Sequence, residues 1–436
     1  MTEAKPAAKR TVSPRALEWA RSRSLLSYTD VAVKLKRRTI DANTIEEWER
    51  GEGQPSAAQV RALAKIFRVP ERWLYYEEPP RIFDDLGIVD FRTTDRRPLT
   101  RLSQNLRGAI EHALAVQAWV AEHRARSQDE RVVLVGARSV RDSARAVADY
   151  LRKTLGVEQL RGSAKDAAEF FKALRRQVEA LGVLVLRMGQ VANKTAWSLD
   201  PDEFKGFTLI DEDQLAPLIF INRKDLDDAQ LFTLGHELAH LVTGGSGVSN
   251  EAIEDFDEDK SDVERFCDEV AEELLVPVAC FEQAWGKSTR GLELDEGRIE
   301  GVAAELKVTS LLAGRRAVTL KRVTPRSFFR LVATRREQPV VEKKAGGSPY
   351  ISMPSWYGTD LVRLLASAAT TEHPSGSDAL ELLGVTFDTA IKLAQVKQVQ
   401  RGGLQKEREV GSASGLPRME RFPLVEIDDS WRVERR

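Results

Sequence analysis

Two histidines and a glutamate between positions 236 and 240 are the residues whose types and spacing most clearly indicate chemistry. His236 and His240 are four residues apart, so on a helix both imidazoles emerge from one face about one turn apart. Two protein ligands of one tetrahedral zinc ion require this arrangement. Glu237 is displaced around the same helix, where a carboxylate can act as a base on a water held by the metal. The spacing therefore predicts a zinc site with Glu237 as general base.

The residues around this motif are typical of a helix. Asp227 or Asp228 can cap its start, and Gly244 with Gly245 can end it. Between these ends the leucines recur on one side of the helix, at Leu231, Leu234, Leu238 and Leu241. An ordinary amphipathic helix with two exposed histidines is the alternative interpretation, and a third ligand elsewhere in the chain would argue against it.

The segment 261–277 supplies a candidate third ligand. It predicts a second helix, on which Glu264 and Asp268 lie four residues apart and share a face. Glu264 can complete a His-His-Glu site, and Asp268 can accept a hydrogen bond from the far nitrogen of a liganding histidine. Two alternatives stay open. Ser261 and Glu264 also fit a capping box, and residues 251–275 hold 12 acidic residues, so a carboxylate at any given spacing is common there.

The composition indicates a globular chain of two or three domains. Its 436 residues are 42% hydrophobic and 31% charged, which suits buried cores with a hydrated surface. Because 66 basic residues oppose 67 acidic ones, a nucleic-acid surface would need local segregation of charge. Two cysteines, Cys267 and Cys280, predict reduced thiols. With no signal sequence and no apolar run of about 18 residues, we expect a cytoplasmic protein with no membrane partner.

Residues 13–80 predict five short helices with clear start signals. Capping pairs are expected at Ser27 with Asp30, at Asn43 with Glu46, and at Ser56 with Gln59. WERGEGQPS (48–56), with the flanking SYTDVAVKLKRR and AAQVRALAKIFRVPERWL, resembles the Cro/repressor-type (XRE) helix-turn-helix. The resemblance implies a recognition helix around residues 41–49. It also implies binding of double-stranded DNA, with candidate contacts at Lys36, Arg37, Arg38, Asn43 and Thr44.

The charge pattern of this first domain is compatible with either of two kinds of partner. Residues 1–83 carry five more basic than acidic residues, and the basic cluster just before the recognition helix can contact phosphates. However, Tyr28 stands where the family commonly has glutamine, and the recognition helix carries Glu46, Glu47 and Glu49, which phosphate would repel. Docking of a protein partner is therefore the alternative to DNA binding.

A second resemblance covers the zinc motif. The runs PLIFIN, FTLGHELAHL and ERFCDEVAEELLVP, followed by KVTSLLAGRRAV, resemble the ImmA/IrrE-type zinc metallopeptidases, in which a strand pair precedes the HExxH helix and a glutamate helix follows it. The resemblance implies His236, His240 and Glu264 as zinc ligands and Glu237 as general base. Together with the helix-turn-helix, the architecture resembles the longer members of that family.

The predicted fold class is α+β. We expect an N-terminal five-helix bundle, a zincin-like metallopeptidase domain with a small antiparallel sheet formed by 206–210 and 217–222, and a C-terminal helical unit. His112 and His123 fall on a polar helix without metal-ligand spacing. The predicted segments are a disordered tail (1–12), the helix-turn-helix domain (13–83), a helical linker (84–130), the zinc metallopeptidase domain (131–335), a linker (336–349), a small helical domain (350–396) and a charged tail (397–436).

These features predict a zinc-dependent endopeptidase coupled to gene regulation. Because the resembled family typically cuts repressors, a transcriptional repressor or related regulatory protein is the expected substrate. The alternative is a non-proteolytic DNA-binding regulator or antitoxin-like module that uses zinc as a structural or sensing element.

Overall fold

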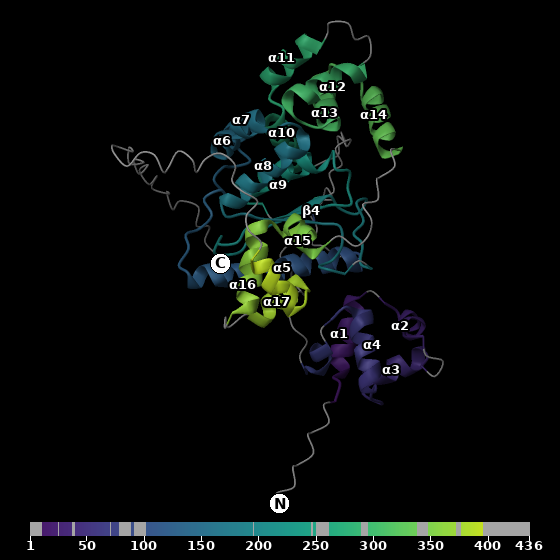
Figure 1. Cartoon of the computed structure of the whole chain (residues 1–436). Coiled ribbons are helices and arrows are strands. Elements are labelled where there is room, and N and C mark those ends of the chain that lie inside the picture. The colour runs from purple at the N-terminus through teal and green to yellow at the C-terminus, as the bar shows by residue number, and fades with distance from the viewer. Residues whose placement is uncertain are drawn as a thin grey trace, which may run out of the picture. The chain divides into compact units, whose positions relative to one another are not determined.

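The computed structural model describes most of the chain (Figure 1). The described residues are 11–24, 26–36, 40–69, 71–77, 89–90, 102–194, 196–245, 247–249, 261–288, 295–337, 348–371 and 376–395. They belong to one unit that ends at residue 395. Arg37, Arg38, the predicted charged tail and nearly all of the predicted N-terminal tail lie outside the described residues.

The N-terminal bundle consists of four α-helices and one 3-10 helix. They are α1 (Pro14–Arg23), α2 (Tyr28–Leu35), α3 (Ala42–Arg50), α4 (Ala57–Phe67) and η1 (Glu71–Tyr75). Apolar side chains from all five pack together and are buried, among them Leu17, Val31, Ile45, Leu63 and Leu74. The amphipathic spacing of the sequence therefore does produce a bundle of five helical elements.

Two of the three predicted capping pairs form. Ser27 and Ser56 each make a full capping box with the residue three positions later. The prediction for Asn43 with Glu46 is wrong, because α3 begins two residues earlier: Asp41 is its N-cap and accepts a hydrogen bond from the Thr44 amide. A carboxylate at this position also interacts favourably with the positive, N-terminal end of the helix dipole.

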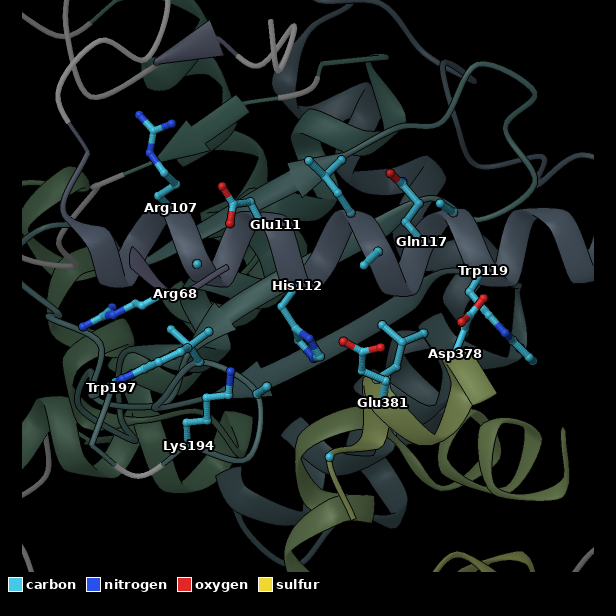
Figure 2. Close-up of a pocket in the computed structure, with 18 of the residues that line it drawn as sticks. Arg68, Arg107, Glu111, His112, Gln117, Trp119, Lys194, Trp197, Asp378 and Glu381 are labelled. Atoms are coloured by element: carbon cyan, nitrogen blue, oxygen red, sulfur yellow. The ribbon is translucent and has the colours of Figure 1, made fainter. Parts of the chain in front are cut away.

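Four described helices lie in the chain between the first and second strands of the sheet: α5 (Gln104–Arg126), α6 (Ala144–Leu155), α7 (Val157–Ser163) and α8 (Ala167–Ala180). The expectation that α5 is a polar helix is wrong for one of its faces. On that face Ile110, Ala113, Val116 and Val120 are buried at helical spacing. Another side of α5 lines a cavity, into which His112 projects (Figure 2).

The sheet has five strands in the order β1-β5-β3-β4-β2. The strands are β1 (Val89–Asp90), β2 (Leu184–Met188), β3 (Gly206–Leu209), β4 (Leu218–Asn222) and β5 (Gly247–Ser249). The predicted antiparallel pair is present as β3 and β4, with Phe207 opposite Phe220. The sheet is mixed rather than antiparallel, because β2 runs parallel to β4 and β1 runs parallel to β5. The chain reaches β4 from β2 through β3, which allows this parallel pairing.

The zinc-motif helix and the glutamate helix pack against each other beside the sheet. They are α9 (Gln230–Val242) and α10 (Asp262–Leu275), and every residue of α9 is buried. At Gly235 an added Cβ would lie 3.0 Å from Leu275 Cδ1, so the absence of a side chain allows the two helices to approach closely. Helices α11 (Val278–Ser288), α12 (Asp295–Leu306), α13 (Ser310–Thr319) and α14 (Pro325–Glu337) follow.

The last four described helices return to the body of the molecule. They are α15 (Pro349–Tyr357), α16 (Thr359–Thr370), α17 (Gly376–Leu383) and α18 (Phe387–Ala394). Helix α15 packs on β2, and the buried Arg175 of α8 donates hydrogen bonds to Ser355 O and Val185 O at 2.7 Å each. Within the described residues, no helix combines the length and apolar character that crossing a bilayer requires.

Candidate metal centre

Helix α9 presents the two motif histidines inside the protein. His236 and His240 are 2% and 1% exposed, so the alternative of an amphipathic helix with exposed histidines is wrong. The predicted cap at Asp227 or Asp228 is also wrong, since the N-cap is Ala229 without a side-chain hydrogen bond. Asp227 instead accepts a hydrogen bond from Arg187 at 2.8 Å, because its side chain turns toward that guanidinium.

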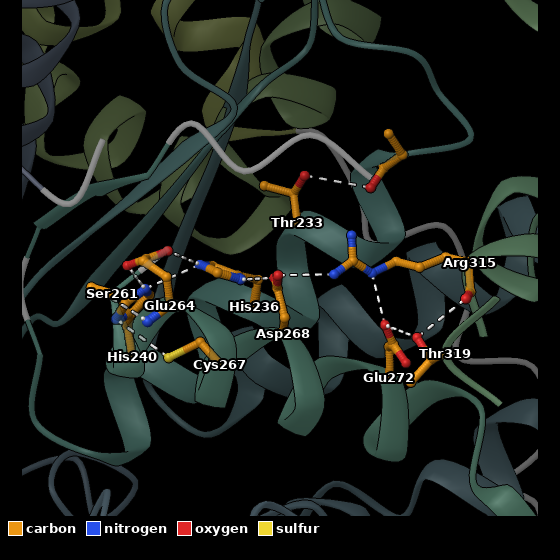
Figure 3. Close-up of polar contacts among 11 residues, drawn as sticks. Thr233, His236, His240, Ser261, Glu264, Cys267, Asp268, Glu272, Arg315 and Thr319 are labelled. Atoms are coloured by element: carbon orange, nitrogen blue, oxygen red, sulfur yellow. Dashed lines mark hydrogen bonds and ion pairs between the residues drawn. The ribbon is translucent and has the colours of Figure 1, made fainter. Parts of the chain in front are cut away.

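Helix α10 brings Glu264 against both histidines (Figure 3). Glu264 Oε2 lies 3.0 Å from His236 Nε2, and Glu264 Oε1 lies 3.2 Å from His240 Nε2. Ser261 caps the helix by accepting a hydrogen bond from the Glu264 amide, but the Glu264 side chain reaches the histidines. The cap and the metal-ligand interpretation are therefore compatible, because they use different atoms of Glu264.

The donor set fits a tetrahedral zinc ion. One ligand atom from each of His236, His240 and Glu264 lies within 4.8 Å of the others, and the two Nε2 atoms are 3.1 Å apart. Ligands about 2.0–2.1 Å from a tetrahedral ion lie about 3.3 Å from one another, close to these separations. Although they are buried, the Glu264 oxygens make no hydrogen bond of suitable angle with any described residue. A cation would satisfy them.

Burial and mutual charge govern the protonation of these groups. Burial would lower the pKa of His236, but the nearby Glu264 and Asp268 carboxylates raise it well above its ordinary value. Burial would likewise raise the pKa of Glu264, yet the two imidazoles lower it to about 2. An ionised Glu264 is the form that a metal cation requires.

Asp268 holds the first histidine from behind. Its Oδ1 lies 2.9 Å from His236 Nδ1, so Asp268 accepts the Nδ1 proton and Nε2 faces the ligand cluster, where a bound cation would replace its proton. Arg315 of α13 then donates to Asp268 Oδ2 and to Glu272 Oε1, at 2.8 Å each. Figure 3 shows this chain running from Glu264 through His236 and Asp268 to Arg315. Sequence reasoning missed Arg315, since no spacing links α13 to α9.

Glu237 lies on the sheet side of α9 and is fully buried. Thr208 of β3 donates a hydrogen bond to Glu237 Oε2 at 2.7 Å, while Oε1 has no hydrogen-bond partner among the described residues. Burial raises the pKa of Glu237, which suits a group that must take up a proton. A Cβ at Gly206 would lie 2.8 Å from Glu237 Oε1, so glycine is needed where β3 passes the carboxylate.

Cys267 occupies the outer side of the second histidine. Its buried Sγ lies 3.6 Å from His240 Nδ1, the ring nitrogen opposite the one that faces Glu264. The thiol therefore contacts the back of a candidate ligand. It does not belong to the converging set of His236, His240 and Glu264.

Comparison with known families identifies two domains of this architecture. A model of the IrrE N-terminal-like domain, from the M78 family of peptidases, matches residues 178–318, which contain the whole donor set. The chain contains an IrrE N-terminal-like domain. A helix-turn-helix model matches residues 17–74, so this peptidase-type domain is fused to an N-terminal helix-turn-helix of the XRE type. Searches of curated proteins and of solved structures give no match.

The helix-turn-helix domain that precedes the IrrE N-terminal-like domain exposes only part of the predicted DNA contacts. Lys36 and Asn43 are exposed, and Thr44 is half-buried with its hydroxyl donating to Asp41. Arg37 and Arg38 lie outside the described residues. The structure thus brings Asn43 and Thr44 together on the first turn of α3, with Lys36 at the end of α2.

The acidic residues of α3 are partly neutralised within the bundle. Glu49 accepts two hydrogen bonds from Arg21, at 2.7 and 2.8 Å, and Arg50 lies 3.9 Å from Glu46. Tyr28 packs under the same Arg21, 4.1 Å from ring centroid to guanidinium carbon. Internal pairing reduces the repulsion that these glutamates would exert on phosphate, because Arg21 offsets the charge of Glu49.

Proposed function

We propose that this protein is a zinc-dependent endopeptidase, with His236, His240 and Glu264 as zinc ligands and Glu237 as general base. The convergence of three buried donor atoms beside an unsatisfied Glu237 oxygen carries the proposal. The match of residues 178–318 to a peptidase-family domain supports it.

The residues of the chain have separable tasks in peptide hydrolysis. When bound, zinc supplies a Lewis acid at the three-donor cluster. Glu237 takes a proton from the attacking water on Oε1 and delivers it to the leaving amine, while Thr208 holds Oε2 and orients the carboxylate. Asp268 fixes the tautomer of His236, and the surrounding burial excludes competing water.

The substrate that we propose is a transcriptional repressor or related regulatory protein. The fusion to a helix-turn-helix domain supports this choice, since that domain can bring the peptidase to an operator through Lys36, Asn43 and Thr44, or dock a protein partner. Because such regulators act on DNA, we also propose that the protein is cytoplasmic. The segment boundaries 13–83, 84–130 and 131–335 stay predictions, and the family models match narrower ranges.

The Glu237→Gln variant tests the proposed reaction. Glutamine keeps the shape of the side chain but cannot take up a proton, so cleavage of co-expressed repressor candidates should fall by about 10²–10⁴-fold. Elemental analysis should still find one zinc per chain, because the ligands are unchanged. Peptide mapping of cellular proteins, wild type against variant, identifies the substrate and the cleaved bond.

Glu296→Gln provides the matched control, since Glu296 is exposed on α12. It should retain both zinc and cleavage. Unchanged cleavage in Glu237→Gln would refute the hydrolase. If zinc is retained and no protein is cleaved even by the wild type, the non-proteolytic regulator with a structural or sensing zinc would be favoured instead.

A further inference from the structure

A large cavity lies apart from the proposed metal centre. Its volume is about 860 Å³, within the range of small-molecule sites, and none of the metal-donor residues lines it. Helix α5, the segment 191–197 after β2, helix α17 and the helix-turn-helix domain all contribute to its wall (Figure 2). The proposed peptidase reaction uses none of these segments.

Small residues on α5 create the space. Gly108, Ala115 and Ala118 all line the cavity, and both alanine side chains are exposed to it rather than packed against another helix. The aromatic residues Trp73, Trp119 and Trp197 also contribute to the wall. A wall of small and aromatic side chains favours an occupant with a flat or apolar body.

Two cations share one indole at one side of the cavity. Arg68 Cζ lies 4.4 Å and Lys194 Nζ lies 4.0 Å from the ring centroid of Trp197. Arg68 also donates a hydrogen bond to Asn105, which is neutral, and neither cation forms an ion pair with a carboxylate among the described residues. Two neighbouring positive charges that form no ion pair with a carboxylate among the described residues favour an anion between them.

Two of the five acidic residues that line the cavity, Asp378 and Glu381, belong to α17. Figure 2 shows them on the opposite side of His112 from Arg68 and Lys194, although the charge of Glu381 still acts on Lys194. Around His112 the cavity therefore has a basic side and an acidic side. This arrangement orients a polar ligand with its acid group toward Trp197.

His112, between these two sides, is a neutral wall residue. Its Nε2 lies 2.8 Å from the Tyr357 hydroxyl, which donates its own proton to Leu382 O at 3.1 Å. Because that hydroxyl has only one proton, His112 Nε2 must be the donor in their contact, and Nδ1 is the ring's acceptor. The ring therefore adds a hydrogen-bond acceptor, without a competing positive charge.

We propose that this cavity binds an organic anion with an aromatic or apolar body, whose acid group contacts Arg68 and Lys194 beside Trp197. Arg68 caps α4 of the helix-turn-helix domain, and Lys194 belongs to the IrrE N-terminal-like domain. One bound anion thus contacts both domains. The site is an effector site, independent of the proposed zinc chemistry.

Two fluorescent probes of nearly the same shape test the proposal on the full chain. 8-Anilinonaphthalene-1-sulfonate has an acid group, and N-phenyl-1-naphthylamine has the same rings without it. In Lys194→Gln, the dissociation constant for the sulfonate should rise about tenfold, the effect of losing one charge-assisted contact. The constant for the neutral probe should stay within about twofold. Lys172→Gln, on the exposed side of α8, is the matched control and should change neither constant.

Filling the cavity provides a second test. Ala115→Phe should weaken binding of both probes by about tenfold or more, because the ring occupies the space itself. Ala118→Leu, a smaller replacement, should act in the same direction, and circular dichroism verifies that each variant folds. Sulfonate affinity that is equal in Lys194→Gln and Lys172→Gln, or unaffected by both cavity-filling changes, would overturn the proposal. These measurements need neither zinc nor a peptidase substrate, so they remain informative if the peptidase function fails.

Discussion

The proposed metal centre and the cavity lined by α5 (the α5 cavity) are organised in opposite ways. In the proposed metal centre His236 is supported from behind by Asp268 and Arg315. In the cavity, Arg68 and Lys194 lie against the face of Trp197 and form no ion pair with a carboxylate among the described residues. The first arrangement is fixed before any ligand arrives, whereas the second is completed by its ligand.

A buried histidine in the first region and a half-buried one in the second show the same difference. Near His236, carboxylates outweigh the effect of burial and raise the imidazole pKa. Near His112, burial and the positive charge of Lys194 lower the imidazole pKa to about 4. A carboxylate-rich surrounding prepares a site for a cation, while a neutral imidazole beside two cations prepares one for an anion.

The largest effect should come from Gly206→Ala in the metal centre. Its Cβ would lie 2.8 Å from Glu237 Oε1 and 2.9 Å from both Phe220 O and Thr233 Cγ2, so the carboxylate must move. Cleavage of the substrate identified with Glu237→Gln should fall by about 10³-fold. Zinc content should persist, because Gly206 touches no metal donor.

Gly162→Ala is the control for this substitution, since an added Cβ there meets nothing within 4 Å. It should leave cleavage unchanged. Full activity in Gly206→Ala would show that the position of Glu237 is less constrained than the contacts of β3 imply. The contrast between a fixed metal centre and an adjustable cavity would then weaken.

A smaller effect is expected from Arg315→Gln, which removes support behind the metal centre. Asp268 and Glu272 would each lose a charged partner at 2.8 Å, and Asp268 would hold His236 Nδ1 less firmly. Zinc affinity, measured by competition with a chromophoric chelator, should fall about 10–100-fold. Arg315→Lys should recover part of this loss, because it restores the charge without the two-pronged geometry.

Arg322→Gln separates this effect from the general loss of an ion pair. Arg322 pairs with Glu282 at 2.7 Å, but the pair is partly exposed and includes none of the proposed metal donors. Its zinc affinity should match that of the wild type. If Arg315→Gln and Arg322→Gln bound zinc equally well, the chain from His236 to Arg315 would be structural only.

Local spacing explains what the sequence predicted of the site. His236 and His240 converge because four residues make about one helical turn, and Glu264 with Asp268 repeats that rule on α10. Thr208 and Gly206 carry no such signal, since their roles depend on how β3 passes α9. The helix starts in the helix-turn-helix domain and the β3/β4 pair were also predictable, because their signals lie close together in the sequence.

Long-range assembly explains what the sequence did not predict. The parallel pairing of β2 with β4 depends on the path of the whole sheet. The α5 cavity combines segments near residues 68, 112, 194 and 381, and no periodicity within one of them indicates the others. The sequence around His112 indicates only a polar helix, because the partner Tyr357 is 245 residues away and leaves no local signal.

The smallest effect concerns the pH dependence that His112 gives to the α5 region. Because its pKa is about 4 when folded, against about 6.5 when unfolded, the unfolded chain binds more protons between these values, so stability rises with pH there. Lowering the pH from 7 to 5 should therefore cost about 1–2 kcal/mol through this group. In His112→Gln, whose amide can still donate to Tyr357, the loss in free energy of unfolding between pH 7 and pH 5, measured with urea, should be smaller by that amount.

Tyr357 does not titrate in this range, since burial raises its pKa further, and Lys194 stays charged. The metal donors titrate equally in both proteins and cancel in the difference. Identical slopes would mean that His112 is protonated as readily in the folded chain as in water, which would contradict a cavity wall closed around a neutral imidazole.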